Sequence, residues 1–433
     1  MKKLIILTAV MIFIAAGARG QWTMHTTPTT QSLNKIFVLN SSTIFAVGTN
    51  QVILKTTNGG AQWIKLRETA DYELNGVYFQ NELTGIAAGG SYYNNGTMKG
   101  IILKTTNGGT TWDSTIINNN CIRTLFFVNS NTGYAGGWAY YLPSPLLKTT
   151  NFGVNWTAIS NIPGLAAVTG ISFINENTGW AAGDSSIGGA HQGVIKTTDG
   201  GTSWFSTAYF GNIINCQIYT AAFINENTGW LGGVMFSPVW GGMILKTTNG
   251  GINWVQQANH CYNELYDIFF IDENTGWAGS DGPMMQKTTN GGVNWNVQSI
   301  QQTSWIHSVK FSDANVGWCV GTDGYIFSTL NGGGTISVQN ISTEVPSTYL
   351  LEQNYPNPFN PSTKIRYSIP KSGFVKLEIF DALGREVETL VNQTQTSGTY
   401  EASFAGENYP SGVYFYKLSS GNFQSIKKMV LVK

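Results

Sequence analysis

The chain has 433 residues, and its 24 basic and 24 acidic side chains give a formal net charge of zero. Because the net charge is zero and charged residues are only 11 % of the total, the composition gives no electrostatic case for nucleic-acid binding, and we expect no nucleic-acid partner. The 51 glycines and the 13 % of aromatic residues favour a turn-rich, well-buried all-β protein.

The chain begins with the pattern of an export signal. Lys2-Lys3 precedes an apolar stretch from Leu4 to Ala16, and Ala18-Arg19-Gly20 supplies small residues for a cleavage site. We expect residues 1–20 to be a Sec signal peptide. The apolar stretch is too short to span a bilayer, and no later stretch is long enough, so we expect no transmembrane segment.

Seven copies of one short sequence motif, here called the repeated phrase, follow. The first reads Thr56-Thr57-Asn58-Gly59-Gly60-Ala61-Gln62-Trp63, and the others start at Thr105, Thr149, Thr197, Thr247, Thr288 and Thr329. A period of about 41–50 residues with strand-like content is typical of a β-propeller with four strands per blade. We therefore predict a seven-bladed β-propeller over residues 21–338.

The sixth copy shows the strands of one blade. Leu265 to Phe270 is a β-rich run and predicts the first strand, Trp277 to Gly279 the second, and Met284 to Thr289 the third. The repeated phrase then forms the turn to the fourth strand. Trp22 to Met24 resembles the end of such a fourth strand, and we expect it to close the ring by joining the last blade.

The repeated phrase has three candidate structural positions. In the third copy Phe152 replaces the first glycine, so we infer that the second glycine needs a conformation that a Cβ atom would forbid. We expect the Trp to lie between neighbouring blades. The residues are Asn58, Gly60, Trp63, Asn107, Gly109, Trp112, Asn151, Gly153, Trp156, Asp199, Gly201, Trp204, Asn249, Gly251, Trp254, Asn290, Gly292 and Trp295.

A lysine precedes the phrase in six copies. We interpret these residues as solvated strand ends that discourage edge-to-edge aggregation. They are Lys55, Lys104, Lys148, Lys196, Lys246 and Lys287.

The phrase resembles the Asp-box of sialidases and, more closely, the repeats of photosystem II assembly and stability factors. The resemblance covers Gln21 to Val338, although only Asp199 keeps the acid of the sialidase box. It implies a seven-bladed propeller with the boxes on the turns between third and fourth strands. Those turns lie on the face opposite the usual ligand face, so we do not interpret seven boxes as seven binding sites.

The loops on the other face carry the candidate ligand-binding residues, because loop length varies there and loops carry function. Aromatic side chains around a propeller mouth suit sugar stacking or a protein partner, although they could also only cap the blades. The candidates are Tyr92, Tyr93, Trp138, Tyr140, Tyr141, Phe236, Trp240, Tyr262 and Trp305.

Catalytic patterns are few. A glycosidase needs two facing carboxylates, and no spacing in the sequence pairs any two. A sialidase grips its substrate with three arginines, whereas the mature propeller holds only Arg67 and Arg123. We expect no catalytic residue, no cofactor and no metal site, and a non-enzymatic binding or scaffold protein. A secreted glycoside hydrolase or lyase and a structural surface component remain alternatives.

Four cysteines meet an oxidising space after export. Cys216 and Cys261 fall near the same point of adjacent repeats, so they form either a disulfide or two buried thiols.

The pattern changes after Val338. Residues 339–349 are polar and predict a linker, and residues 350–433 predict a small Ig-like β-sandwich. Alternation of apolar and charged residues in Val375 to Ile379 is typical of a half-buried strand.

Residues 350–433 closely resemble the type A C-terminal sorting domain of the type IX secretion system. This implies the secretion translocon as a partner and a protein that passes through the periplasm of a Gram-negative cell to its outer surface or beyond. The matching residues include Asn354, Tyr355, Pro356, Asn357, Pro358, Phe359, Gly384, Gly412, Tyr414 and Lys428.

Overall fold

The computed structural model describes most of the chain, in two compact units that divide between Gly333 and Gly334. Each unit is described by itself. The described residues are 22–92, 98–139, 146–160, 162–184, 192–209, 216–236, 240–257, 264–282, 284–300, 305–333, 338–342, 345–406 and 409–433.

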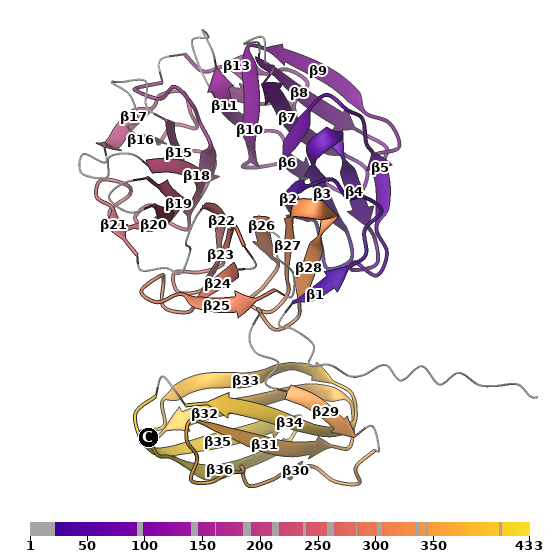
Figure 1. The fold of residues 1–433 in the computed structure, drawn as a ribbon, viewed down its shortest axis with the longest axis vertical. Helices are drawn as coiled ribbons and strands as arrows, with labels where there is room; N and C mark the ends of the chain where they lie inside the picture. The colour runs from indigo at the N-terminus through magenta and orange to yellow at the C-terminus, as the bar shows by residue number, and fades with distance from the viewer. Residues whose placement is uncertain are drawn as a thin grey trace, which may run out of the picture. The chain divides into compact units, whose positions relative to one another are not determined.

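The first unit is a seven-bladed β-propeller, as the repeats predicted (Figure 1). Each blade is a four-stranded antiparallel sheet whose first strand lies innermost and contacts the first strands of both neighbouring blades. The innermost strands are β2 (Leu33–Val38), β6 (Glu73–Phe79), β10 (Asn120–Phe127), β14 (Gly170–Phe173), β18 (Cys216–Phe223), β22 (Leu265–Phe270) and β26 (Ile306–Phe311).

The other strands follow outward in chain order. The second strands are β3 (Ile44–Gly48), β7 (Gly85–Tyr92), β11 (Gly133–Ala139), β15 (Gly179–Asp184), β19 (Gly229–Met235), β23 (Gly276–Ser280) and β27 (Gly317–Gly321). The third strands are β4 (Ile53–Thr56), β8 (Met98–Thr105), β12 (Leu146–Thr149), β16 (Gln192–Thr197), β20 (Gly241–Thr247), β24 (Met284–Thr288) and β28 (Ile326–Thr329). The fourth strands are β5 (Ile64–Arg67), β9 (Asp113–Asn118), β13 (Thr157–Ala158), β17 (Phe205–Tyr209), β21 (Val255–Gln256) and β25 (Asn296–Ser299).

The last blade takes its fourth strand from the other end of the unit. Strand β1 (Thr23–His25) pairs antiparallel with β28, with Met24 opposite Phe327. This is the ring closure expected for Trp22 to Met24. Two short 3-10 turns, Thr49–Gln51 and Thr322–Gly324, follow the second strands of the first and last blades.

The repeated turn is held by its own side chains. In the first copy the Thr56 hydroxyl accepts a hydrogen bond from the Gly60 amide, and the Asn58 side-chain oxygen accepts one from the Gln62 amide. Gly59 and Gly60 both have positive φ, at 63° and 83°. The second glycine also approaches the neighbouring blade, because a Cβ on Gly60 would collide with the Trp318 ring. The second glycine is therefore needed for two reasons: its positive φ, which we expected, and its close contact with the neighbouring blade.

Aromatic stacks join the blades. In the fifth blade the Phe223 ring stacks on Trp180 of the preceding blade at 3.9 Å between centroids, and the box residue Trp254 meets its edge at 5.9 Å. The arrangement recurs at Phe173 and Phe270. Each such contact buries large apolar surface between blades and contributes about 1 kcal/mol beyond the burial itself.

The lysines before the boxes are not simply solvated strand ends, which corrects our interpretation. The Lys246 ammonium lies 5.1 Å above the Trp230 ring and donates a hydrogen bond of 2.8 Å to the Gly291 carbonyl of the next blade. Trp230 Nε1 donates to the same carbonyl at 3.2 Å. Burial lowers the pKa of Lys246 and of Lys287. These lysines therefore tie neighbouring blades together.

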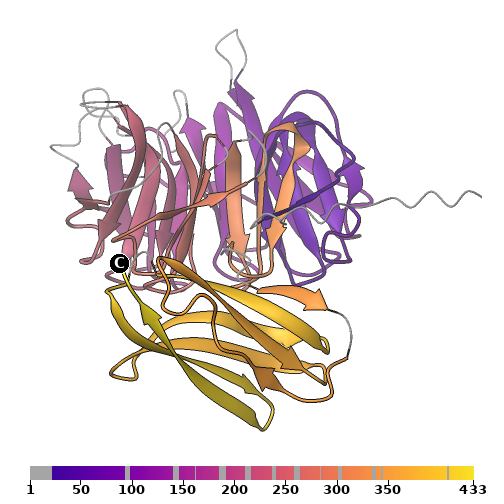
Figure 2. The ribbon, with the colours of Figure 1, turned by 60° about the horizontal axis from the view of Figure 1, so that its bottom comes forward.

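The second unit is a β-sandwich of two four-stranded sheets (Figure 2), with strand orders β29-β34-β31-β30 and β33-β32-β35-β36. Strand β29 occupies part of the expected linker and pairs with β34. The bounds are β29 (Val338–Ser342), β30 (Leu350–Leu351), β31 (Ser362–Ile369), β32 (Gly373–Asp381), β33 (Glu386–Gln395), β34 (Gly398–Ala405), β35 (Gly412–Ser420) and β36 (Phe423–Leu431).

Candidate functional site

The predicted loop aromatics fall into separate places. Phe236 and Trp240 form an exposed pair with ring centroids 4.9 Å apart, outside the central cavity. Trp138 lines that cavity. Trp305 is not among the lining residues; it is 48 % exposed, and its ring lies 6.2 Å from that of Tyr266, which lines the cavity. The side chain of Tyr92, and Tyr93, Tyr140, Tyr141 and Tyr262, lie outside the described residues, as does Cys261. Cys216 is buried at the start of β18, and its disulfide remains a prediction.

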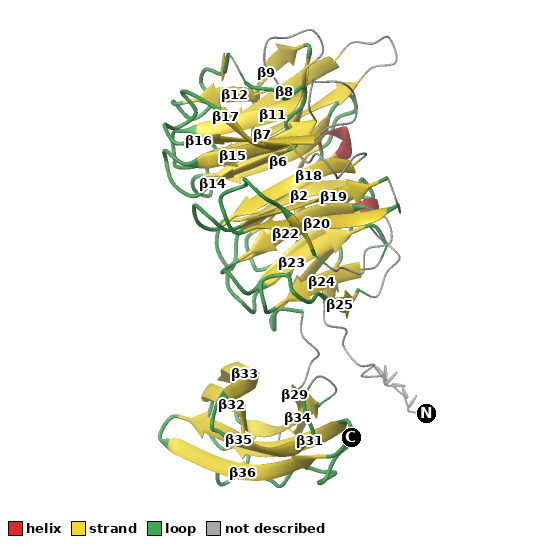
Figure 3. Cartoon of the chain, turned by 90° about the vertical axis from the view of Figure 1, so that its left-hand side faces the viewer, coloured by secondary structure: helices red, strands yellow, loops and turns green. Residues whose placement is uncertain are grey.

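The channel between the blades holds a cavity of about 730 Å³. Residues of all seven innermost strands line it, and these strands run side by side around the axis (Figures 1 and 3). Each strand begins on the face that carries the connections between blades, here called the loop face. Each ends at the turn to its second strand, on the face of the boxes.

One polar side chain from each blade forms a ring near the loop face. Each member follows a buried aliphatic residue at the start of an innermost strand, and six of the seven sit at a β-bulge. Bulges redirect a side chain away from the regular alternation of the strand. The polar ring consists of Asn34, Asn75, Arg123, Thr169, Tyr219, Tyr266 and His307.

Glycines in the second strands make room for the bulges. A Cβ on Gly89 would collide with the backbone carbonyl of Glu73, and one on Gly233 with that of Gln217. The glycine of the recurrent Gly-Trp-Ala-Ala-Gly stretch in the fourth blade, Gly183, meets the Ala167 carbonyl in the same way. These glycines let the innermost strand approach closely enough to present the polar ring.

Four members of the polar ring are engaged with the next blade. Asn34 Nδ2 donates to the Leu74 carbonyl, Asn75 Nδ2 to that of Ile122, Thr169 Oγ1 to that of Ile218 and His307 Nδ1 to that of Leu33. Burial lowers the pKa of His307, so this ring nitrogen donates from a neutral imidazole. Arg123, Tyr219 and Tyr266 make no such backbone bond among the described residues; the Tyr219 hydroxyl donates to Gln217 Oε1 at 3.2 Å, and Arg123 is paired with Glu73.

One wall of the cavity is aromatic. The Tyr219 and Tyr266 rings are 5.9 Å apart and inclined by 16°, and the Trp305 ring continues the series at 6.2 Å and 26°. Burial, the charge of Glu264 and a hydrogen bond to it raise the pKa of both tyrosines. Their hydroxyls are therefore protonated donors at neutral pH. We call Tyr219, Tyr266 and Trp305 the aromatic wall.

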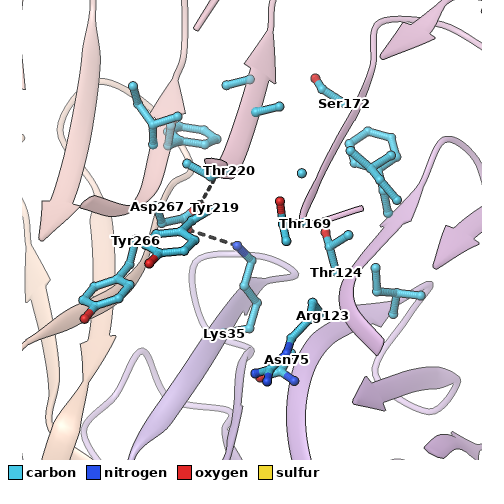
Figure 4. Close-up of a pocket in the computed structure, with 18 of the residues that line it drawn as sticks. Lys35, Asn75, Arg123, Thr124, Thr169, Ser172, Tyr219, Thr220, Tyr266 and Asp267 are labelled. Carbon is cyan, nitrogen blue, oxygen red and sulfur yellow. Dashed lines mark hydrogen bonds and ion pairs between the residues drawn. The ribbon is translucent and has the colours of Figure 1, made fainter. Parts of the chain in front are cut away.

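The facing wall carries a loosely held arginine. Arg123 Nη1 reaches Glu73 Oε2 at 3.5 Å, and its guanidinium lies 5.0 Å above the Trp138 ring. Arg123 Nε and Trp138 Nε1 are buried and have no hydrogen-bond partner within the described ranges. Figure 4 shows Arg123 across the cavity from Tyr219 and Tyr266. A ligand between the walls meets stacking surfaces on one side and the partly exposed side chain of Arg123 on the other.

An ionised carboxylate lies deeper in the wall. Asp267 is buried and accepts hydrogen bonds from Lys35 Nζ at 3.1 Å, Ser308 Oγ at 2.8 Å and Thr220 Oγ1 at 3.2 Å, as Figure 4 shows in part. Burial alone would raise its pKa, but Lys35, Lys310 and these bonds hold it below the usual value. Because its oxygens are occupied and its proton is lost, Asp267 does not suit general acid or base catalysis.

Across the described ranges, no three His, Cys, Asp or Glu residues lie close enough together to hold a metal ion. The described residues also contain no helix long and apolar enough to cross a membrane.

The sorting-motif residues organise one end of the β-sandwich. Asn354 is buried and donates to the Pro356 carbonyl and the Thr363 hydroxyl, while Phe359 lies in the core and pairs its amide with the Val430 carbonyl. Tyr355 is 81 % exposed. Among the other motif residues, Gly384 has a φ of 78° in its turn, and the Tyr414 hydroxyl donates to the Pro410 carbonyl.

Fold and terminal domain together define a class: a β-propeller of Asp-box-type repeats that carries a C-terminal sorting domain. Residues 353–433 match the secretion system C-terminal sorting domain, and residues 253–352 match photosynthesis system II assembly factor YCF48. The suspected resemblances are confirmed by these matches. The sorting domain implies export to the outside of the cell or its surface.

Solved structures show the same fold. YCF48 bound to D1 peptide is 17 % identical with a TM-score of 0.52, over 72 % of this chain and 97 % of that one. YCF48 from Cyanidioschyzon merolae is 18 % identical with a TM-score of 0.52, over 71 % and 98 %. The WD40 β-propeller domain of Doa1 is 12 % identical with a TM-score of 0.54, over 72 % and 96 %. The comparison with curated proteins finds no match.

Proposed function

We propose that this protein passes through the periplasm and the type IX translocon, and then acts outside the cell as a non-enzymatic binding propeller. Its ligand is a glycan that enters the central cavity from the loop face. The observation that carries this proposal is the aromatic wall facing Arg123 and Trp138 across a cavity of about 730 Å³. A sugar ring stacks its apolar face on an aromatic side chain and at the same time bonds its hydroxyl groups to fixed polar partners, so a site that offers both suits a glycan.

The donors and acceptors of the site suit hydroxyl groups. Tyr219 and Tyr266 present phenolic oxygens, Glu73 and Glu264 present carboxylate oxygens, and Arg123 presents a guanidinium. A bound sugar would exchange hydrogen bonds with groups that are otherwise paired with one another, such as Arg123 and Glu73. Such groups make directional hydrogen bonds to a sugar without any chemical step. The buried Asp267 carboxylate also lies in the cavity wall, but its charge is already neutralised by Lys35.

A glycan array with the full chain, followed by calorimetry on any oligosaccharide bound, tests the proposal. We expect Tyr266→Ala and Trp305→Ala each to weaken binding about five- to thirtyfold, because each removes a stacking surface worth about 1–2 kcal/mol. Trp240→Ala is the matched control, since Trp240 is an exposed aromatic residue outside the cavity. Equal losses in all three variants, or release of shortened sugars, would refute a non-enzymatic cavity site.

A protein ligand is the second candidate. One of the similar propellers is described as bound to a D1 peptide, which supports peptide binding by this architecture. A peptide ligand would be favoured over a glycan by two results together. The full chain would capture a peptide that no oligosaccharide displaces, and Tyr266→Ala would abolish this binding.

A further inference from the structure

Among the described residues, one lysine of the cavity has neither a hydrogen-bond nor an ion-pair partner for its ammonium group. Lys310 lies in β26, three residues beyond the polar-ring member His307, and lines the cavity. Among the described residues its side chain makes no hydrogen bond and no ion pair; its ammonium instead lies 4.9 Å above the Phe269 ring. Lys35, by contrast, is paired with Asp267 at 3.1 Å.

The surroundings of Lys310 are mainly apolar. The residues at the same register position in the other blades form a belt around the channel and all line the cavity, namely Phe37, Tyr78, Phe126, Ser172, Ala222 and Phe269. The Ser172 hydroxyl already accepts a hydrogen bond from the Phe223 amide. No carboxylate lies in this belt, so Lys310 has no anionic partner at its own depth.

The charges nearby leave an excess of one positive charge. Lys35 and Lys310 face the single carboxylate of Asp267, whose oxygens are occupied by Lys35, Ser308, Thr220 and the Val309 amide. Burial lowers the pKa of Lys310 to about 8, which still leaves its amine mostly protonated at neutral pH. Removing an ammonium group from water without giving it a partner costs free energy, and an anion placed beside it would offset that cost.

We propose that Lys310 forms an anion subsite deep in the channel, which binds a carboxylate or sulfate group carried by the glycan. The inference rests on the proposed function and narrows the ligand to acidic saccharides. Lys310 lies about 10 Å along the strand from the polar ring, a span that two linked sugar residues can bridge. The acidic residues at the mouth do not block this path, because Glu73 is paired with Arg123 and Glu264 accepts the tyrosine hydroxyls.

The first arm of the test uses inorganic sulfate and acetate as probes on the full chain. Lysine acetylation by acetic anhydride is followed residue by residue by peptide mass mapping. We expect each anion to slow acetylation of Lys310 at least threefold, with no change at Lys99, an exposed lysine of β8. Equal rates at Lys310 with and without both anions would overturn the subsite.

The second arm compares uronate, sulfated and neutral oligosaccharides of one length. We expect at least one acidic series to bind tenfold more tightly than the neutral one, and Lys310→Met to remove that preference while neutral binding persists. The control variant Lys99→Met should keep the preference for acidic saccharides. Glycan binding without charge preference overturns the inference but leaves the proposed function standing. Anion protection of Lys310 without any glycan binding supports the subsite and sinks the glycan proposal.

Discussion

At the scale of single residues, the interior of the channel is governed by one buried charge and its partners. Asp267 and Lys35 are 232 residues apart in the chain and meet only because the first and sixth blades face the same channel. Removing Lys35 would take the ion-pair partner away from the buried Asp267 carboxylate, a loss that costs about 3–5 kcal/mol in comparable cases. Lys310 has no such partner, so its burial is a cost to stability that depends on pH.

Lys310→Met should change the pH dependence of stability. The pKa of Lys310 is about 8 in the folded protein, below its ordinary value of 10.5. Between these values the unfolded chain binds more protons, so the wild-type free energy of unfolding rises with pH, by up to about 1.4 kcal/mol per pH unit. Below pH 8 Lys310 is charged in both the folded and the unfolded protein, so the folded state bears the full free-energy cost of burying the ammonium group. The Met variant does not bear this cost and is therefore more stable than wild type there.

Urea unfolding at pH 7, 8, 9 and 9.5 measures this effect. The advantage of Lys310→Met over wild type should shrink steadily above pH 8, whereas Lys99→Met should run parallel to wild type. A constant difference between Lys310→Met and wild type across the series would show that the lysine does not titrate in this range.

At the scale of elements, the repeated turn sets the spacing between blades. Its glycines and Trp were recognisable in the sequence because they recur, and the third copy even separated the two glycine positions. The place of Phe152 follows from packing: the second blade has Ile86 where other blades have an aromatic residue, and Phe152 supplies the ring beneath Lys104. Phe152 adopts a φ of 51° to do so.

Gly59→Ala and Gly60→Ala should differ in cost. Both glycines have positive φ, so each substitution costs about 1 kcal/mol in backbone strain. A Cβ on Gly59 meets only the Ser41 carbonyl at 3.4 Å, whereas one on Gly60 collides with the Trp318 ring of the last blade. We expect Gly60→Ala to lose about 3 kcal/mol in all. Thermal and urea unfolding measure both, and equal losses would contradict the blade-spacing role.

At the scale of the whole molecule, the fold was predictable from the sequence, whereas of the candidate site only Trp138 and Trp305 were among the predicted residues. The period of the boxes predicted seven blades, and Leu265 to Phe270 was predicted and found as an innermost strand. The polar ring was missed because Asn34, Arg123 and His307 share no chemistry and converge only when the ring closes. One signal was available: aligning the repeats shows a polar residue after the first buried aliphatic residue of every innermost strand.

The central claim is that a saccharide enters the cavity and stacks on the aromatic wall. The most direct test is a crystal structure of the full chain with a bound oligosaccharide from the array. Our account predicts a sugar ring against Tyr266 and Trp305, with a polar contact to Arg123. A saccharide seated on the exposed Phe236–Trp240 pair, or on the face of the boxes with the cavity empty, would contradict it.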